Sequence, residues 1–578
     1  MKALKRIGVI SMTILLVTGG AGCGRFGKGN TDDPNTLYVG NYQGGLGKAW
    51  LEEIANKFEA ENPGINVEID EEKDRFGDSM LLQNIKHFRQ DVYFLNQITY
   101  SNYVNAGVLA DITDVVTEKR AEPRLIDGVE TVQSVSIEEK MDDYLADYYK
   151  WDEDERYYAI PFYNSAFGAV YDVDLFDQMK YYFRDDYTSL EDNPFVTTLE
   201  QNTEGGKRTA GVDGEYGTSD DGLPATYDEL FALMDQMKLD NVIPFMWNGQ
   251  YYNYRERFFA SLWADYEGKE NYNLNSSFDG DYVFPAGVLT NEEAAKWNAV
   301  TNTDGSQTVK ISNANAYLLQ KQTGKRIAVK FAHDIIRGGY YRTDSFDTTS
   351  SHLMTQVEYL YSRQKKAPVA FILEGSWWES EARDQGTFAT MAKQYNSNEP
   401  YEQWGFGERK FAFLPVPKSP NSSNQDRRTL LSASGGSVVC INKKTSKLDL
   451  AKKFLAFAHT DESLRIFTRV TGVPRAYDYE LSNDDLEQMT YFSRDLWKIY
   501  SDAQTDIVYH TIFENTMRST EKSYFNVWAF GATNVNGIDY SEPLLAFRTL
   551  TNLTVDDYMD RMLGKYSDWN SRLTSYLS

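Results

Sequence analysis

The chain has few cysteines and a shortage of basic residues, and each shortage excludes a class of protein. Two of the 578 residues are cysteines, Cys23 and Cys440. We expect Cys23 to be modified near the amino terminus and Cys440, within the apolar stretch 437–441, to be buried in a strand. Without an internal disulfide, the fold must depend on a large hydrophobic core. The net charge of −26 argues against nucleic acid and against direct adhesion to anionic lipid, because both require Lys and Arg.

Catalytic motifs are also missing. The five histidines are scattered along the chain, with no His-Glu-x-x-His, no Gly-x-Ser-x-Gly and no metal-ligand spacing. Eighty-five acidic residues make chance carboxylate pairs inevitable, so such pairs do not identify a glycosidase. We therefore expect a protein that is not an enzyme and requires no cofactor, with an exported glycoside hydrolase as the alternative. A cell-surface adhesin would show repeats or β-sandwich patterning, and the sequence shows neither.

The sequence has one long apolar run, residues 7–17, which follows a basic tip and precedes small residues that end at Cys23. This layout is typical of a bacterial lipoprotein signal, and the run is about half of the roughly 20 residues that span a bilayer. We expect a signal peptide over 1–22, lipidation of Cys23 and a polar tether over 23–35. The protein would then lie on the extracellular face of the bacterial cytoplasmic membrane, held only by its lipid anchor. An uncut transmembrane anchor is disfavoured by the glycines where its helix would continue.

The region after the tether opens with a β-α-β unit. Residues 36–39 are predicted to form a strand, and the helically spaced apolar residues of 49–58 follow a Gly-rich turn. An Asn-Pro-Gly sequence ends that helix before the strand 65–69, and 91–95 is a further strand. A β-α-β unit implies a parallel sheet, and alternating strands and helices resume from about residue 352. The sequence therefore predicts an α/β fold with mainly parallel sheets flanked by helices.

Aromatic residues are abundant, with 40 Tyr and 11 Trp. The C–H face of a pyranose is apolar and packs on an aromatic ring, while its hydroxyl rim bonds Asn, Gln, Asp and Glu. A neutral ligand of this kind suits an acidic chain. For any single ring, burial in the core is the more ordinary explanation.

Seven short motifs occur in an order that is typical of one family. They are Phe58-Glu59 with Asn62-Pro63-Gly64 and a strand, the passage 105–113, Tyr158-Ala159-Ile160-Pro161, 171–176, Gly375-Ser376-Trp377-Trp378, Leu414-Pro415, and the strand-helix unit 435–455, which is followed by 472–475. Each motif is weak alone, but their common order is specific. The chain resembles the bacterial extracellular solute-binding proteins of family 1, the sugar-binding lipoproteins of ABC importers, to which maltose-binding protein belongs.

This resemblance implies a two-lobed, periplasmic-binding-protein-like fold of type II with a ligand cleft at the hinge. Lobe 1 would comprise 36–165 and 432–475, and lobe 2 would comprise 166–431 and 476–578. The resemblance also implies a monomer that captures a carbohydrate, which we expect to be an oligosaccharide, and delivers it to the permease subunits of an ABC transporter. A non-sugar solute such as a peptide is the alternative ligand.

The best local candidate for a ligand site is a Gly-Ser-Trp-Trp-Glu sequence that follows a predicted strand. Ser376 and Glu379 are expected to cap the helix that begins there. By resemblance, Trp377 takes the position at which the family stacks a ring on a sugar, and Trp378 offers a second surface. Glu374 could accept hydrogen bonds from ligand hydroxyls, and a capping or surface role is its ordinary alternative.

Further candidate contacts lie at the ends of predicted strands or beside the expected hinge, where open α/β sheets bind ligands. Trp247 ends an apolar strand, Tyr171 matches the family's cleft tyrosine, and Arg475 could reach the cleft as a hydrogen-bonding fork. The Gly-rich first turn is not a phosphate loop, because Lys48 is followed by Ala rather than Ser or Thr. The remaining candidates are Tyr42 and Gln43 in that turn, Asn96 and Gln97 at a strand end, and Tyr163 and Asn164 beside the hinge.

An acidic loop contains Asp213, Glu215, Asp220 and Asp221 among glycines. Oxygen clusters of this kind can wrap Ca²⁺, and weak sites suffice outside the cell. The spacing is not that of an EF-hand. A structural calcium ion is therefore a hypothesis here, beside the alternative of a solvated acidic turn.

Overall fold

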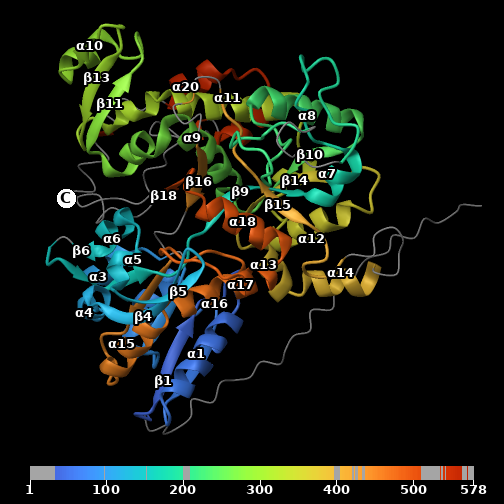
Figure 1. Cartoon of the computed structure of the whole chain (residues 1–578). Coiled ribbons are helices and arrows are strands. Elements are labelled where there is room, and N and C mark those ends of the chain that lie inside the picture. The colour runs from blue at the N-terminus through green and yellow to red at the C-terminus, as the bar shows by residue number, and fades with distance from the viewer. Residues whose placement is uncertain are drawn as a thin grey trace, which may run out of the picture.

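The structure is a computed structural model of the chain (Figure 1). It describes residues 33–96, 98–151, 153–199, 208–395, 404–419, 422, 427–432, 437–509, 534–535, 538–539, 542–562 and 569–570. The predicted signal peptide, Cys23, most of the tether and Gln97 lie outside these residues. Within the described ranges, no helix combines the length and the apolar character that a membrane span requires.

A five-stranded sheet forms the centre of the smaller lobe. In spatial order its strands are β2 (Asn66–Glu71), β1 (Thr36–Asn41), β3 (Val92–Leu95), β17 (Val438–Ile441) and β8 (Ala159–Pro161). Strand β1 pairs in parallel with β2 and β3, and α1 (Ala49–Glu61) buries Trp50 and Phe58 in the core of this lobe. The predicted β-α-β unit is confirmed.

A second sheet of six strands forms the centre of the larger lobe. Its strands are β10 (Ile243–Met246), β14 (Val369–Gly375), β9 (Ala166–Asp172), β16 (Arg428–Ser432) and β18 (Thr505–Tyr509) in spatial order, with β15 (Phe411–Leu414) paired to β9. Helix α9 (Asn253–Ser277) lies against β9, β14, β16 and β18. Its first turn faces the smaller lobe, which matters for the site below.

Each sheet contains one strand that runs against all the others, β17 in the smaller lobe and β9 in the larger, so the prediction of mainly parallel sheets is confirmed. Strand β17 runs antiparallel to β3 and β8, and β9 runs antiparallel to β14, β15 and β16. Parallel neighbours need a long crossover, usually through a helix. Strands β9 and β17 instead enter their sheets directly from the other lobe, so no crossover helix sets their direction.

The chain passes between the lobes after Pro161, after Ser432 and after α17 (Asn483–Glu487). It leaves β8 at Pro161 and enters β9 at Ala166, and it leaves β16 at Ser432 and enters β17 at Val438. Residues 476–481 pack in the core of the smaller lobe, so the last passage follows them. Ser432 thus belongs to the larger sheet and 476–481 to the smaller lobe, which differs from the expected boundaries by a few residues.

The remaining elements cover these sheets or form small additions. In the smaller lobe they are α2 (Asp78–Asn84), η1 (Ile85–His87), α3 (Tyr100–Asn105), α4 (Thr113–Thr117), the hairpin β4 (Arg120–Ile126) and β5 (Val129–Val135), α5 (Ile137–Lys140), α6 (Asp143–Tyr149), β6 (Lys150–Trp151), β7 (Arg156–Tyr157), α15 (Leu448–Phe457), α16 (Asp461–Thr471) and α17 (Asn483–Glu487). In the larger lobe they are α7 (Val173–Met179), α8 (Tyr227–Leu239), α11 (Thr323–Gly338), η3 (Thr343–Phe346), α12 (His352–Ser362), α13 (Trp378–Asp384), α14 (Thr387–Tyr395), α18 (Tyr491–Ser501), β19 (Asn534–Val535), β20 (Ile538–Asp539), α19 (Pro543–Thr549) and α20 (Val555–Met562).

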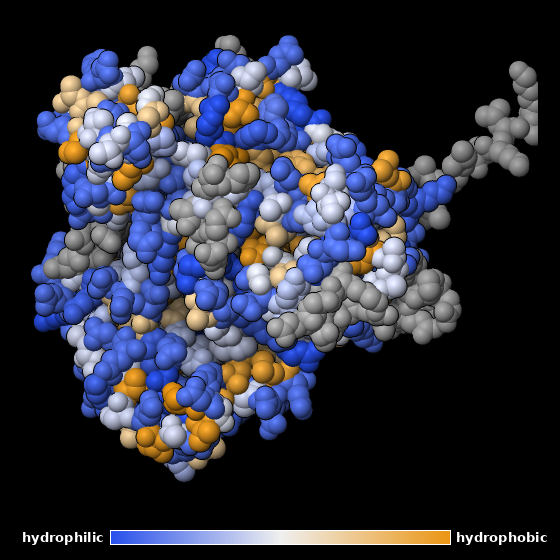
Figure 2. All heavy atoms as spheres, turned by 45° about the horizontal axis from the view of Figure 1, so that its top comes forward, coloured by the Kyte–Doolittle hydropathy of each residue, from blue (hydrophilic) through white to orange (hydrophobic). Residues whose placement is uncertain are grey.

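A small subdomain with its own core projects from the larger lobe (Figure 1). It contains β11 (Gly280–Phe284), α10 (Asn291–Lys296), β12 (Val300–Thr301), β13 (Gln307–Ile311) and η2 (Ala316–Lys321). The face of the molecule shown in Figure 2 is mostly hydrophilic, with smaller apolar patches. This polar surface agrees with the negative mean hydropathy of −0.54.

Candidate ligand-binding site

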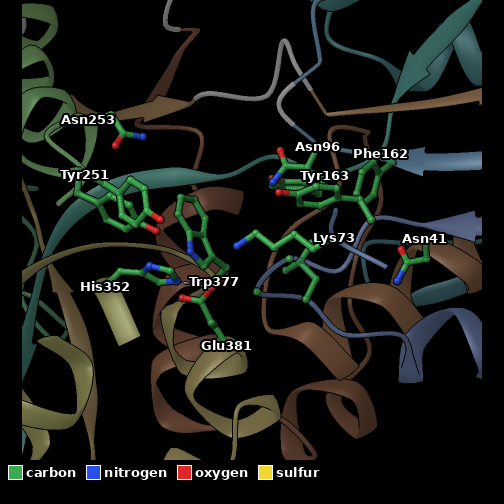
Figure 3. Close-up of a pocket in the computed structure, with 15 residues that line it drawn as sticks. Asn41, Lys73, Asn96, Phe162, Tyr163, Tyr251, Asn253, His352, Trp377 and Glu381 are labelled. Carbon is green, nitrogen blue, oxygen red and sulfur yellow. Dashed lines mark ion pairs between the residues drawn. The ribbon is translucent and has the colours of Figure 1, made fainter. Parts of the chain in front are cut away.

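A cavity of about 190 Å³ lies between the two lobes (Figure 3). The smaller lobe lines it with residues that end or follow strands β1, β2, β3 and β8, and the larger lobe lines it with the first turns of α9, α12 and α13. From the smaller lobe come Asn41, Tyr42, Lys73, Asn96, Phe162 and Tyr163. From the larger lobe come Tyr251, Asn253, Tyr254, His352, Trp377 and Glu381.

Trp377 is the central ring of the cavity. It lies two residues after the end of β14, at the N-cap position of α13, and it is the half-buried one of the two adjacent tryptophans. The edges of Phe167 and Tyr254 pack on it, with centroids 4.9 and 6.0 Å away and interplanar angles of 83° and 72°. A Cβ on Gly375 would lie 2.3 Å from the indole Cη2, so only glycine leaves room for the ring there. The indole is thus held from behind and points into the cavity.

The Gly-rich turn after β1 closes the cavity from the smaller lobe. A Cβ on Gly45 would lie 2.6 Å from Trp377 Cδ1 and 3.0 Å from Glu381 Cβ. A Cβ on Gly47, whose φ is +60°, would lie 2.1 Å from Asp384 Oδ2. The lobes therefore touch here through bare backbone, and the glycines permit a close approach rather than phosphate binding.

A chain of polar groups lies beneath Trp377. His352 Nε2 lies 3.3 Å from Glu381 Oε1, and Gln356 donates through Nε2 to Glu381 Oε2 (2.9 Å) and to Glu374 Oε1 (3.3 Å). Burial, followed by the nearby Glu381 charge, raises the pKa of Glu374 well above its usual value of 4.5. Glu374 is thus an internal support of Glu381, and Glu381 is the carboxylate at the cavity.

Of the predicted site residues, Tyr42, Asn96, Tyr163 and Trp377 meet at this cavity. Ser437 donates a hydrogen bond through Oγ to Asn96 Oδ1 at 3.1 Å, which fixes the amide at the end of β3. Burial is the main cause that raises the pKa of both Tyr42 and Tyr163, so both stay neutral hydroxyls. The nearby Gln43 is exposed and does not line the cavity.

Three predicted contacts are core residues, which corrects their assignment to the ligand. Trp378 is fully buried and packs edge-on against Phe411 at 4.9 Å. Trp247 is buried against Tyr341, and Tyr171 is buried in the core of the larger lobe. Each ring is enclosed in a hydrophobic core of the larger lobe, so none of them reaches the cavity.

Three others stabilise the hinge region or support the site from within. Asn164 donates through its side chain to the Tyr500 hydroxyl and accepts from Ser432 Oγ of the larger lobe, while its backbone N–H donates to the Pro474 carbonyl of the smaller lobe at 2.9 Å, so it joins both lobes at the first passage. Arg475 is fully buried in the smaller lobe, where its Nη2 lies 2.8 Å from His459 Nε2. Glu374, described above, is also buried. None of the three lines the cavity.

The predicted cap of α13 is also different. Trp377, not Ser376, is the N-cap residue, and no side chain caps this helix. Ser376 instead bonds Ala166 twice, donating from its backbone N–H to the carbonyl (2.8 Å) and accepting at Oγ from the Ala166 N–H (3.1 Å). This link attaches the start of β9 to the site.

The acidic loop is closed by hydrogen bonds and by an arginine. Asp220 Oδ2 accepts from the Val212 N–H at 2.8 Å, Asp221 accepts from the Gly217 N–H at 2.9 Å, and Arg428 Nη1 lies 3.4 Å from Asp213 Oδ2. Among the described residues, no group of three or more His, Cys, Asp or Glu is placed to hold a metal ion. This arrangement gives the calcium hypothesis for Asp213, Glu215, Asp220 and Asp221 no support, since the cation that meets the loop is the Arg428 guanidinium.

A family model described as bacterial extracellular solute-binding protein matches residues 53–478 of the chain, which is more than half of its length. The chain belongs to this family. Membership of this family means that the protein binds a solute outside the cytoplasm, as the order of the motifs predicted. No match to it was found among curated proteins.

Solved structures of similar fold include the apo form of RafE from Streptococcus pneumoniae, with a TM-score of 0.51, 14% identity, and coverage of 95% of this chain and 100% of RafE. A sugar transporter from Bacillus licheniformis in complex with stachyose has a TM-score of 0.42, 15% identity, and coverage of 92% and 100%. At such identities the similarity concerns the fold alone. The predicted two-lobed α/β fold of the solute-binding protein is confirmed.

Proposed function

We propose that this solute-binding protein captures an oligosaccharide between its lobes and delivers it to the permease subunits of an ABC importer. The observation that carries the proposal is the composition of the inter-lobe cavity. Aromatic rings from both lobes, Tyr42 and Tyr163 on one side and Tyr251, Tyr254 and Trp377 on the other, surround a small set of polar groups. Rings for the apolar sugar face and polar groups for its hydroxyls are what a sugar requires.

The size of the cavity indicates how the ligand enters. Its volume of about 190 Å³ is below the roughly 300–1,000 Å³ of pockets that enclose a drug-sized ligand. A single sugar ring suits such a space, so an oligosaccharide must extend out of it or hold the lobes further apart. Binding groups on both lobes then shift the population toward the closed form, which the permease would recognise.

The proposal includes attachment to the membrane through lipid on Cys23, with the protein as a monomer and the anchor as its only membrane contact. Support comes from the amino-terminal sequence, since a basic tip, an apolar run and small residues precede this cysteine. Cys23→Ala should move the protein from the membrane fraction to the medium in cell fractionation. Retention of Cys23→Ala in the membrane fraction would contradict the anchor.

Calorimetric titration of the protein with raffinose, stachyose, malto-oligosaccharides, oligogalacturonates and peptides tests the ligand class. We expect saturable binding of one oligosaccharide class, weakened about tenfold or more in Trp377→Ala, because an aromatic contact contributes on the order of 1.5 kcal/mol. Trp297→Ala is the matched control, since Trp297 is also half-buried but lies in the separate subdomain. If only peptides bind, the proposed sugar ligand is wrong and the solute is a peptide. If the protein releases reducing ends from an oligosaccharide, the glycoside hydrolase alternative is correct.

A further inference from the structure

A lysine without a protein partner extends into the cavity. Lys73 follows β2 in the smaller lobe, and Figure 3 shows its ammonium pointing toward Trp377. Within the described ranges, Lys73 makes no hydrogen bond and no ion pair. Its neighbour in the first turn, Lys48, differs, because Lys48 Nζ lies 2.9 Å from Glu52 Oε1. Lys73 therefore brings an uncompensated positive charge to the ligand space.

A second cation without a counter-ion lies on the opposite lobe. Arg257 lies in α9, three residues after the cavity residue Tyr254, and its guanidinium lies 4.5 Å from the centre of the Phe167 ring. Its Nε is buried without a hydrogen-bond partner, and the part of the chain that the structure describes supplies no ion pair to it. Its charge also acts on the Tyr163 hydroxyl, which places it beside the cavity wall.

Burial is the main cause that lowers the pKa of Arg257 below its usual value of 12.5, and the charge of the adjacent Glu256 opposes this shift only in part. The direction shows that the surroundings disfavour the charged guanidinium. Burial of an uncompensated charge costs several kcal/mol. An anion brought by the ligand would offset this cost.

Three carboxylates on the larger-lobe side of the cavity are already engaged. Both oxygens of Glu381 have protein partners, His352 and Gln356, and Asp384 Oδ1 lies 2.7 Å from Arg383 Nε. Glu374 is internal and bonded to Gln356. Among the residues that line the cavity, Lys73 is thus a cation without a protein partner and Glu381 is a carboxylate that is already engaged, although the whole chain carries a net charge of −26. Arg257 lies behind the cavity wall, and Asp74, next to Lys73, acts on the Tyr42 hydroxyl.

We infer that the ligand carries a carboxylate, as an oligosaccharide with uronic-acid units does, and that Lys73 and Arg257 bind this group from opposite lobes. The inference rests on the proposed function, and it replaces the neutral ligand that the overall charge favoured. The planar guanidinium can hold a carboxylate with two parallel hydrogen bonds, while the ammonium acts as a mobile point charge. Because the two cations belong to different lobes, the shared anion would also favour closure.

A matched pair of ligands tests the carboxylate directly. Calorimetric titration with oligogalacturonates is compared with titration of their methyl esters, which keep the sugar chain and remove the charge. We expect the ester to bind about 10- to 100-fold more weakly, in keeping with the loss of a hydrogen-bonded charge pair. The affinity for the acid should fall as the salt concentration rises, while that for the ester should not.

Substitutions of Lys73 and Arg257 then test whether each side chain binds the ligand carboxylate. Lys73→Met should weaken binding of the acid about 10- to 100-fold and leave binding of the ester unchanged. Lys73 is exposed, so this variant should keep the melting temperature of the wild type. Lys48→Met makes the same change in net charge at a lysine outside the cavity and should bind as the wild type does. Arg257→Lys should retain part of the preference for the acid that Arg257→Gln loses.

The outcomes separate this inference from the proposed function. Binding of neutral oligosaccharides with no binding of the acids, or equal affinity for acid and ester, overturns the carboxylate and leaves sugar capture intact. Failure of every oligosaccharide overturns the proposed function itself. Equal losses in Lys73→Met and Lys48→Met would show a general charge effect and refute the role of Lys73.

Discussion

Substituting Gly45 by Ala should weaken ligand binding without removing any ligand contact. Gly45 belongs to the smaller lobe, but a Cβ there would lie 2.6 Å from Trp377 Cδ1 and 3.0 Å from Glu381 Cβ of the larger lobe. Ordinary contacts of a Cβ are 3.4–4 Å. The added methyl group therefore forces the lobes apart or moves the indole and the start of α13.

The magnitude follows from the cost of overpacking, which is about 1–3 kcal/mol for an added methyl group in a close-packed contact. Because the clash lies between the lobes, the cost falls on the closed form and leaves each lobe unstrained. A ligand that requires closure then loses the same free energy, which corresponds to a roughly 5- to 150-fold higher Kd. The melting temperature without ligand should change little.

The assay is calorimetric titration with the sugar identified by the panel, together with the radius of gyration from small-angle X-ray scattering with and without ligand. Gly44→Ala is the matched control, since its Cβ would meet only residues of the same lobe at ordinary distances, Tyr42 at 3.4 Å and Asn96 Nδ2 at 3.9 Å. We expect Gly44→Ala to bind nearly as the wild type does and to compact normally with ligand. Wild-type affinity in Gly45→Ala, or an equal loss in Gly44→Ala, would refute the reasoning.

Three further predictions concern stability. The raised pKa of Glu374 means that the folded protein favours the protonated carboxyl group, so this stabilisation is complete below about pH 4.5 and is lost as the pH rises through the folded-state pKa. The melting temperature of Glu374→Gln should therefore match that of the wild type near pH 4.5 and exceed it at pH 8. Equal melting temperatures of the two proteins at both pH values would contradict this. Trp378→Ala should destabilise the larger lobe by about 3–5 kcal/mol in denaturant unfolding, because it empties a fully buried site, whereas Trp377→Ala should cost much less. Chelation of calcium should leave the melting temperature unchanged because Arg428 already meets the acidic loop, and a drop of several degrees would instead support a calcium site.

Local sequence signals predicted the elements that depend on local chemistry. The helix at 49–58 and the strands on either side of it are present as α1, β1 and β2. At the start of α8, Thr226 and Glu229 form a capping box, for which Thr-x-x-Glu is the local sequence signal. In each case the periodicity of apolar residues or a side chain three residues away determines the structure, so a short window of sequence is sufficient.

Tertiary packing decided the features that the sequence did not reveal. Ser376 has the same capping pattern as Thr226, but its hydroxyl accepts a hydrogen bond from Ala166, which lies 210 residues earlier. Trp377 and Trp378 are adjacent, and the turn between β14 and α13 directs one ring into the cavity and the other into the core. No periodicity distinguishes two neighbours at a helix start.

The cavity residues that the sequence did not predict were missed for a different reason. Lys73, Tyr251, His352 and Glu381 lie in loops or first helical turns that no family motif covers, and folding alone brings them together. The one available signal was the cluster of tyrosines at 251, 252 and 254, which lies at the start of α9 and combines aromatic rings with hydroxyl groups. A search for residues at the ends of predicted strands therefore finds the cavity residues of the smaller lobe. It misses most of those of the larger lobe, which lie in first helical turns.

The arrangement separates closure from ligand selection. The lobes touch through the glycine turn at Gly45, where no side chain of the smaller lobe takes part, whereas the free cations Lys73 and Arg257 lie beside the cavity and take no part in that contact. A change at Gly45 should thus weaken acidic and neutral ligands by the same factor, because it acts on the closed form alone. A change at Lys73 should alter their ratio. The affinities of the acidic oligosaccharide and of its methyl ester are therefore measured for Gly45→Ala, for Lys73→Met and for the double variant. If closure and ligand choice are independent, the losses of binding free energy in the two single variants should add in the double variant. Losses that do not add would show that closure and ligand choice are coupled.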